Sequence, residues 1–185
     1  MMSATQQIAL FLTDTLLTLY IFFLMARAVL EASQADFYNP ISQSVYKLTQ
    51  PLIRWVRLVI PVVGVWDIGC WLLIYAMRVL ELFLIMLIQD VSWPLELLLR
   101  VSAFQVVEWL IQFYMIAIFI LAIASWFVNP MQMMQNPVLS LLNHIITPLV
   151  EPIRRFVPAA GVIDFSPMIV LLALYFLLNI IRLLY

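Results

Sequence analysis

The sequence predicts an all-α integral membrane protein with four transmembrane helices. Apolar residues make up 66% of the 185-residue chain and charged residues only 10%, and the mean hydropathy is +1.09. A soluble fold of this size needs more polar side chains than this to cover its surface. The net charge of −1 and the absence of a dense Lys/Arg face argue against nucleic-acid binding.

Four segments are apolar enough to cross the hydrocarbon core, which takes roughly 20 helical residues for about 30 Å. The expected spans are residues 8–30, 68–88, 106–128 and 166–185. The first run is longer than the apolar region of a signal peptide and no Lys or Arg precedes it, so we expect it to be retained, although residues 33–35 would tolerate cleavage. Residues 91–105 are too short and too charged to span, and predict an interfacial connector that begins near Pro94.

A shift of 97 positions superposes one half of the chain on the other without a gap. Two of the three glycines fall on the same position of the two halves, so chance is a poor explanation. We therefore expect residues 1–90 and 106–185 to be tandem repeats on either side of the 91–105 connector. Within residues 39–67, the superposed identical residues are Asn39/Asn136, Pro40/Pro137, Pro51/Pro148, Leu52/Leu149, Arg57/Arg154, Pro61/Pro158, Gly64/Gly161, Val65/Val162 and Asp67/Asp164.

Each repeat would consist of two spans with a polar segment between them. Because two spans return the chain to the side from which it started, the repeats would be parallel, with a pseudo-two-fold axis along the membrane normal. Inverted repeats are the pattern most closely tied to alternating-access transport. The symmetry therefore mildly disfavours a transporter.

The polar segments, residues 40–60 and 137–157, place apolar residues at helical spacing on one side and polar residues on the other. We call these two segments the collars. Pro51 and Pro148 should kink or restart each helix, because proline removes a backbone hydrogen bond, and Thr147 is expected to cap the second piece. The collars should lie at the headgroup level, where basic side chains reach lipid phosphates or a partner protein: Lys47, Arg54, Arg57, Arg154 and Arg155.

Both collars end in the pattern Arg-x-x-x-Pro-x-x-Gly-x-x-Asp. The proline would end the collar helix, the glycine would allow a sharp turn, and the aspartate would cap the next span or pair with the arginine. A purely structural turn and a binding site both remain open as interpretations. The residues that form the turn motif with Arg57 and Arg154 are Pro61, Gly64 and Asp67 in the first copy and Pro158, Gly161 and Asp164 in the second.

Arg78 and Glu81 lie three residues apart in the middle of the second expected span, close enough to form an ion pair. The pair would either order the helix bundle or border a proton or ion path. Their counterparts in the second repeat are Tyr175 and Leu178, so no symmetric polar track is expected. Cys70 and His144 each stand alone, so no disulfide, metal site or cofactor is predicted, and no catalytic motif occurs.

Basic residues near span ends predict the orientation. The collars contain five Lys and Arg residues, the N-terminal tail contains none and the middle loop contains Arg100 alone. The collars should therefore face the cytoplasm, with both termini in the periplasm.

The duplicated motif, above all Arg-Arg-Phe-Val-Pro-Ala-Ala-Gly-Val-Ile-Asp-Phe-Ser-Pro at 154–167, resembles the YggT family, also called the YlmG family, in its double-length Gram-negative form. The first copy departs from the pattern at residues 68–70, Ile-Gly-Cys, where the second copy has Phe-Ser-Pro. The resemblance implies a bacterial inner-membrane protein without an established enzymatic activity. Relatives are associated with cytochrome-complex biogenesis and nucleoid organisation in chloroplasts, lie near division genes, or have a suggested role in osmotic or ion homeostasis.

Two functions follow as hypotheses. The first is a non-enzymatic accessory, assembly or scaffolding protein whose cytoplasmic collars engage a partner protein or anionic lipid, within a membrane protein complex or homo-oligomer. The alternative is an oligomeric channel or transport component linked to ion or osmotic homeostasis. An enzyme is disfavoured, because no catalytic constellation is visible in the sequence.

Overall fold

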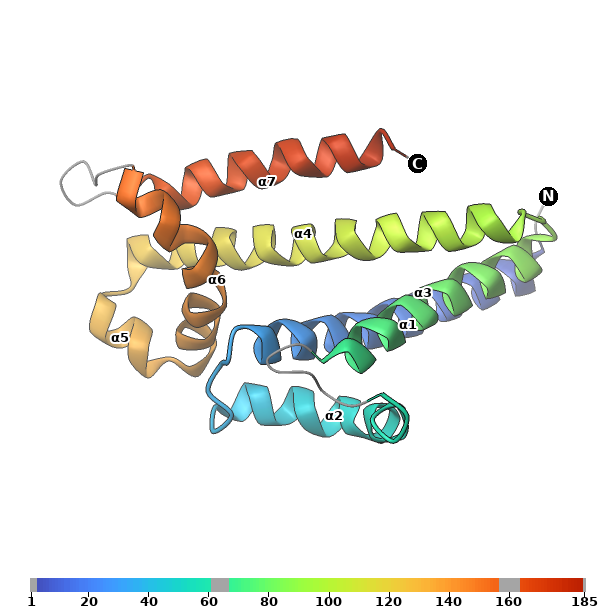
Figure 1. The fold of residues 1–185 in the computed structure, drawn as a ribbon, viewed down its shortest axis with the longest axis horizontal. Helices are drawn as coiled ribbons and strands as arrows, with labels where there is room; N and C mark the ends of the chain where they lie inside the picture. Colours follow the sequence, from blue (N-terminus) through green and yellow to red (C-terminus); the bar gives the residue numbers. More distant parts are fainter. Residues whose placement is uncertain (1–2, 61–66, 157–163, 185) are drawn as a thin grey trace. The chain divides into compact units, whose positions relative to one another are not determined.

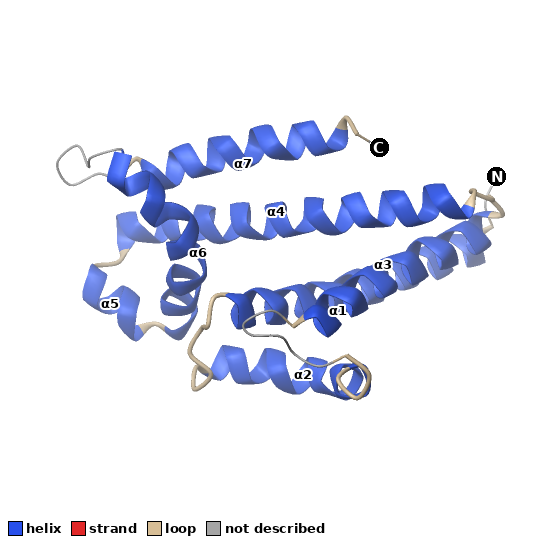
Figure 2. Ribbon diagram, viewed as in Figure 1, coloured by secondary structure: helices blue, strands red, loops and turns tan. Residues whose placement is uncertain are grey.

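The computed structural model describes residues 3–60, 67–156 and 164–184, and within these ranges it contains seven helices and no strand (Figures 1 and 2). The chain divides into two compact units. The first is built from Met1–Ala32 and Ser44–Val107, and the second from Ser33–Gln43 and Glu108–Leu184. The helices are α1 (Ala4–Ala32), α2 (Pro40–Val56), α3 (Ile68–Gln89), α4 (Leu95–Phe127), α5 (Pro130–Gln135), α6 (Pro137–Phe156) and α7 (Ser166–Arg182).

Three helices of the described chain are long and apolar enough to cross a membrane. They are α1, α3 and the stretch Leu95–Ser125 of α4. Even the 22 residues of α3 extend about 33 Å at 1.5 Å per residue, which matches the thickness of the hydrocarbon core. These helices indicate a multi-pass membrane protein.

The fourth expected span corresponds to α7, which is shorter. Its 17 residues extend about 26 Å, less than the roughly 20 residues that a perpendicular span requires. Four full-length spans are therefore not confirmed. Pro167 lies in the first turn of α7, where its missing N–H removes no helical hydrogen bond.

The connector between the expected second and third spans is part of α4. This helix begins at Leu95, next to Pro94 as expected, but continues without interruption for 33 residues through the predicted third span. Leu, Glu, Arg and Ala dominate its first turns and no Gly or Pro follows until its end, so nothing in the sequence stops the helix. The short helix α5, which the sequence analysis did not predict, follows with Pro130 in its first turn.

In the first unit, α1 and α3 run side by side (Figure 1). Every α1 residue from Leu24 to Leu30 is buried, including Arg27. Gly69 at the start of α3 allows the close approach of α2, because a Cβ atom there would lie 3.0 Å from Cγ1 of Val56. Near the far end of α3 a small cluster packs onto α4, formed by Leu82, Leu98 and Val101.

The second unit has an apolar core that joins three helices. Residues of α4, α6 and α7 meet in one cluster of buried side chains, and the burial of this apolar surface stabilises the unit. The cluster contains Ala117, Ile118, Leu121, Leu139, Ile146, Val150 and Val170.

Each collar helix begins at an Asn-Pro pair. Oδ1 of Asn39 accepts a hydrogen bond from the backbone N–H of Ile41 at 2.9 Å, and Oδ1 of Asn136 accepts one from Val138 at 2.9 Å. The proline after each asparagine is the first residue of α2 or α6. The duplicated Asn-Pro thus supplies an N-cap and a residue that needs no hydrogen-bond partner.

The internal prolines do not divide the collar helices. α2 continues through Pro51, and α6 continues through Pro148 and Pro152. The two separate pieces expected for each collar are therefore not confirmed, because one missing hydrogen bond can be tolerated where the flanking turns are packed. The expected capping role of Thr147 is wrong: its hydroxyl donates to the carbonyl of Asn143 at 2.6 Å, one turn earlier in the same helix.

Candidate functional site

The end of the first collar is tied to the start of α3 by Arg57 and Asp67. Nε and Nη2 of Arg57 lie 3.0 and 2.6 Å from Oδ2 of Asp67. Oδ1 of the same aspartate accepts the backbone N–H of Cys70 at 3.0 Å and so caps α3. Burial lowers the pKa of Arg57, but the bonds to Asp67 and Glu31 outweigh it and hold the pKa above its usual value. The carboxylate of Asp67 therefore neutralises Arg57 and also caps the N-terminus of α3.

Glu31 at the end of α1 extends this pair into a buried network. Its Oε1 lies 2.8 Å from Nη2 of Arg57 and 3.2 Å from Nε of Arg27. Nη1 of Arg27 donates to Thr49 and Gln50 of α2, at 3.0 and 3.1 Å. The guanidinium of Arg27 is only 1% exposed, and its charge is balanced within the unit by Glu31 while Thr49 and Gln50 accept its hydrogen bonds.

Tyr46 of α2 completes the surroundings of Arg27. The guanidinium carbon of Arg27 lies 4.6 Å from the centre of the Tyr46 ring, a cation–π contact. Burial, and then the negative charge of Glu31, raise the pKa of Tyr46 to about 12. The phenol therefore stays neutral at all physiological pH values.

The second collar repeats the arginine–aspartate pair without the network. Nε of Arg154 lies 2.7 Å from Oδ2 of Asp164, and Oδ1 of Asp164 accepts the backbone N–H of Ser166 at 2.9 Å. Burial raises the pKa of Asp164, but the hydrogen bonds from Ser166 and Arg154 outweigh it and lower the pKa below its usual value. Half of the Arg154 side chain is exposed, and Glu151 approaches it at 3.8 Å.

The two halves differ in the residues that surround the arginine–aspartate pair. The first copy has Arg27, Glu31 and Thr49, whereas a shift of 97 positions replaces all three with apolar residues. One replacement belongs to the hydrophobic core of the second unit, so this half is held by apolar packing where the first is held by hydrogen bonds and ion pairs. The apolar counterparts are Ala124, Val128 and Ile146.

The remaining predicted basic residues are exposed. Lys47, Arg54 and Arg155 have no acidic partner within the described ranges. The Arg54 guanidinium lies 4.9 Å from the ring centre of Trp55. Three of the five predicted cations are therefore available to a phosphate or carboxylate from outside the chain. Four residues of the turn motif lie outside the described residues: Pro61, Gly64, Pro158 and Gly161.

A second polar cluster lies within the helices of the first unit. Nη1 of Arg78 lies 2.7 Å from Oε2 of Glu81, whose side chain is fully buried. The hydroxyl of Thr18 on α1 donates to Oε1 of Glu81 at 2.9 Å, and Nε of Arg78 donates to Gln105 of α4 at 2.9 Å. The cluster therefore connects α1, α3 and α4 through one neutralised pair.

A further ion pair, absent from the sequence predictions, joins α4 to α7. Nη2 and Nε of Arg182 lie 2.5 and 2.8 Å from Oε1 of Glu108, and Gln112 donates to the same oxygen at 3.0 Å. The two charges are 74 positions apart in the chain. Only the apolar setting of each charge indicated that a partner was needed.

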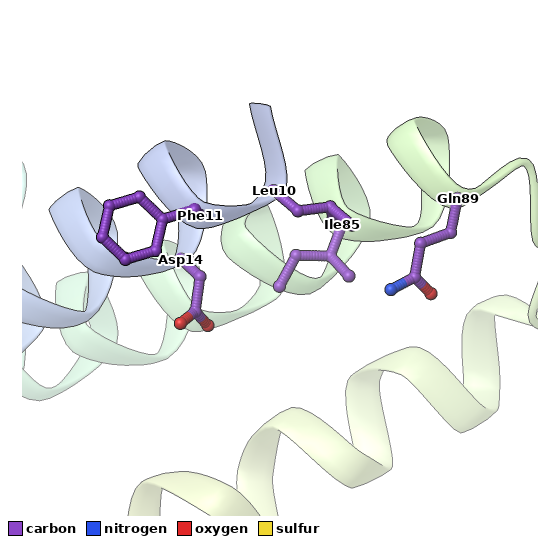
Figure 3. A pocket seen from close by; sticks show the side chains of 5 residues that line it. All are labelled: Leu10, Phe11, Asp14, Ile85 and Gln89. Atoms are coloured by element: carbon purple, nitrogen blue, oxygen red, sulfur yellow. The ribbon is translucent and has the colours of Figure 1, made fainter. Parts of the chain in front are cut away.

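Asp14 on α1 contrasts with these pairs. Its exposed carboxylate has no partner among the described residues, and it lines, together with Gln89, a shallow depression between α1 and α3 (Figure 3). The other lining residues are apolar: Leu10, Phe11 and Ile85. A carboxylate ten residues inside an apolar helix is costly unless it reaches water or a cation, so this place is a candidate contact with another molecule.

The two isolated residues occupy different environments. The thiol of Cys70 is buried in α3 and approaches the carbonyl of Leu24 at 3.6 Å. The imidazole of His144 is exposed on α6, with Nε2 3.0 Å from the carbonyl of Ser33. Neither belongs to a group of three or more metal-ligating side chains within the described ranges.

Comparisons with known proteins agree with the resemblance noted in the sequence. A family model described as CCB3/YggT matches residues 6–88 and again residues 101–185. The Escherichia coli K12 protein named uncharacterized protein YggT is 36% identical over 168 residues, covering 89% of this chain and 84% of its own length. No solved structure matches.

Two further relatives have similar coverage. A Vibrio alginolyticus protein described as an uncharacterized protein in the proC 3′ region is 34% identical over 171 residues, which is 90% of this chain and 89% of its own. An uncharacterized protein of Haemophilus influenzae is 31% identical over 173 residues, which is 94% of this chain and 90% of its own. With the two family matches that cover most of its length, the chain belongs to the CCB3/YggT family.

Proposed function

We propose that this protein is a non-enzymatic accessory or scaffolding protein of the bacterial inner membrane, whose collars engage a partner protein or anionic lipid. The proposal rests on one observation: some basic side chains of the collars are paired within the chain, and others are not. Arg57 and Arg154 are used internally, whereas Lys47, Arg54 and Arg155 are exposed and have no acidic partner in the described part of the chain. Unpaired cations at a membrane surface attract anionic headgroups or acidic partners.

We also propose that the chain is a parallel duplication with four spans, in which α7 is the fourth. The double match of the family model supports this arrangement, as do the equivalent Asn-Pro caps and arginine–aspartate pairs. Local thinning of the bilayer and snorkelling of the flanking side chains accommodate a helix of 17 residues. The positive-inside rule then assigns the collars to the cytoplasm and the termini to the periplasm.

The proposed partner is another membrane protein or a second copy of this chain. Large apolar side chains are exposed along α1, α3, α4 and α7, so these helices have surfaces available for lipid or for other spans. Asp14, which has no partner in the part of the chain that the structure describes, places one charged side chain within that surface.

The test is purification of the tagged protein from its own membranes in mild detergent, with identification of stoichiometric companions. Replacing Lys47, Arg54 and Arg155 by Gln should lower retention of the companion protein or of anionic lipid. Arg100→Gln is the matched control, because Arg100 is exposed but lies on α4, outside both collars. Equal retention by the triple variant and the control would contradict the proposal.

The buried Arg78–Glu81 cluster favours a second candidate, an oligomeric channel or transport component linked to ion or osmotic homeostasis. A polar cluster shared by three helices is one way to border an ion route. Glu81→Gln should then change ion flux in proteoliposomes at unchanged protein content. If flux is the same and only stability falls, the cluster is structural.

A further inference from the structure

α2 has an exposed apolar stripe beside its buried face. Leu48 is 52% exposed, Leu52 37%, Trp55 61% and Val59, just after the helix, 81%. Their spacing of four, three and four residues places them along one side of a helix. Large apolar side chains in such an arrangement are unstable in water and require a cover.

The face of α2 next to this stripe is buried within the first unit. Val45, Thr49 and Ile53 are buried, and Thr49 receives the hydrogen bond from Arg27. At about 100° of rotation per residue, this buried face borders the stripe, while Lys47 and Arg54 lie on the remaining, polar side. α2 therefore has one face for α1, one exposed apolar face and one cationic face.

The equivalent side of α6 is not a continuous stripe: Phe156, the counterpart of Val59, is 83% exposed, but the positions before it differ. Ile145, which corresponds to Leu48, is 3% exposed, and Leu149 is half-buried. At the position of Trp55, α6 has Pro152. The exposed stripe is thus a property of the first collar rather than of both.

We infer that the stripe of α2 inserts into the boundary between headgroups and acyl chains of an anionic bilayer. Charge complementarity selects this occupant: the exposed Lys47 and Arg54 border the stripe and match lipid phosphates. Trp55 supports it, because tryptophan favours the membrane interface and its ring here lies against the Arg54 guanidinium. The first collar is therefore a membrane anchor.

This inference depends on the membrane location in the proposed function, but not on any protein partner. The experiment therefore uses the purified full-length protein in phosphatidylcholine vesicles with and without phosphatidylglycerol. In a Cys70→Ala background, Trp55→Cys or Leu52→Cys is labelled with an environment-sensitive fluorophore. Lys47→Cys is the matched control on the polar side of the same helix.

Labels at positions 52 and 55 should emit at shorter wavelength, and lipids with a quencher at the top of the acyl chain should quench them at least about twofold more than a label at position 47. Adding Arg54→Gln should weaken this quenching only in vesicles that contain phosphatidylglycerol. Water-like emission at both stripe positions, with efficient quenching by aqueous iodide, would show that the stripe faces water and would overturn the inference. Loss of a companion protein in the purification experiment would leave these signals unchanged, so the two proposals fail separately.

Discussion

Arg57 and Arg154 occupy equivalent positions in the two halves, yet their surroundings predict different contributions to stability. Arg57 bridges two carboxylates and is two-thirds buried, whereas Arg154 is half-exposed and bound chiefly to Asp164. The ten-residue spacing was enough to suggest an arginine–aspartate contact from the sequence, because both residues border one turn. The sequence could not indicate Glu31 or Arg27, because these contacts depend on how α1 packs against α2 and α3.

We therefore predict that Arg57→Gln destabilises the protein far more than Arg154→Gln. The first change leaves Asp67 and Glu31 without their shared cation, which costs on the order of 3 kcal/mol for a buried pair. The second removes an exposed interaction worth about 1 kcal/mol or less. Thermal unfolding in detergent, followed by the helical circular dichroism signal, measures both. Equal shifts in Tm would contradict the role assigned to Glu31.

The lowered pKa of Asp164 predicts how the stability of the folded protein depends on pH. Its folded-state pKa is lowered, so its contribution to stability is fully present above the unfolded-state pKa of about 3.9 and is lost as the pH falls through the lower folded value. The difference in Tm between the wild type and Asp164→Asn should be constant from neutral pH to about pH 5 and should shrink below pH 4. A difference that persists unchanged at acid pH would show that the carboxylate charge is not the cause.

At the scale of elements, periodicity and length predicted α1 and α3 to within a few residues, because long apolar runs with clear ends leave few alternatives. The merged helix α4 was missed because charge in residues 91–105 was taken to mean a separate interfacial segment, although no residue after Pro94 breaks the helix. The prolines of α2 and α6 predicted a kink or a restart in each collar, whereas each helix continues through them, so a restart is not confirmed. Both differences arise where local composition and backbone preference point to different structures.

Pro51→Ala should stabilise α2. Because the helix continues through residue 51, an N–H at that position gains the carbonyl of Lys47 as a partner, and we expect a gain of about 1–3 kcal/mol. Pro40→Ala should change stability much less, since the first helical position needs no such bond. Thermal unfolding of both variants is the measurement. A lower Tm for Pro51→Ala than for the wild type would mean that the proline is required for the geometry of the collar.

For the molecule as a whole, two halves of similar sequence are stabilised by different kinds of interaction. The first unit contains buried ionic clusters around Glu31 and Glu81, and the second contains a continuous apolar core and the Glu108–Arg182 pair. The membrane class and the family were accessible from composition and motifs. The asymmetry was not, because it depends on contacts between helices that are distant in the sequence.

Glu81→Gln and Asp14→Asn should separate a structural charge from an unpaired one. The first leaves Arg78 without its carboxylate in an apolar setting and should cost about 3–5 kcal/mol. The second removes a charge with no partner among the described residues and should leave Tm unchanged or raise it. Thermal unfolding in detergent compares them. A stable Glu81→Gln protein would remove the structural explanation of the cluster.

The arrangement of the two halves across the membrane is the central claim, and thiol accessibility tests it most directly. Single cysteines would be introduced in a Cys70→Ala background at Lys47 in α2, Asn143 in α6 and Ser92 between α3 and α4, all exposed positions. An impermeant reagent added to intact inner-membrane vesicles of each orientation should label positions 47 and 143 from the cytoplasmic side and position 92 from the periplasmic side. Labelling of positions 47 and 143 from opposite sides would contradict the parallel duplication and the shared cytoplasmic collars.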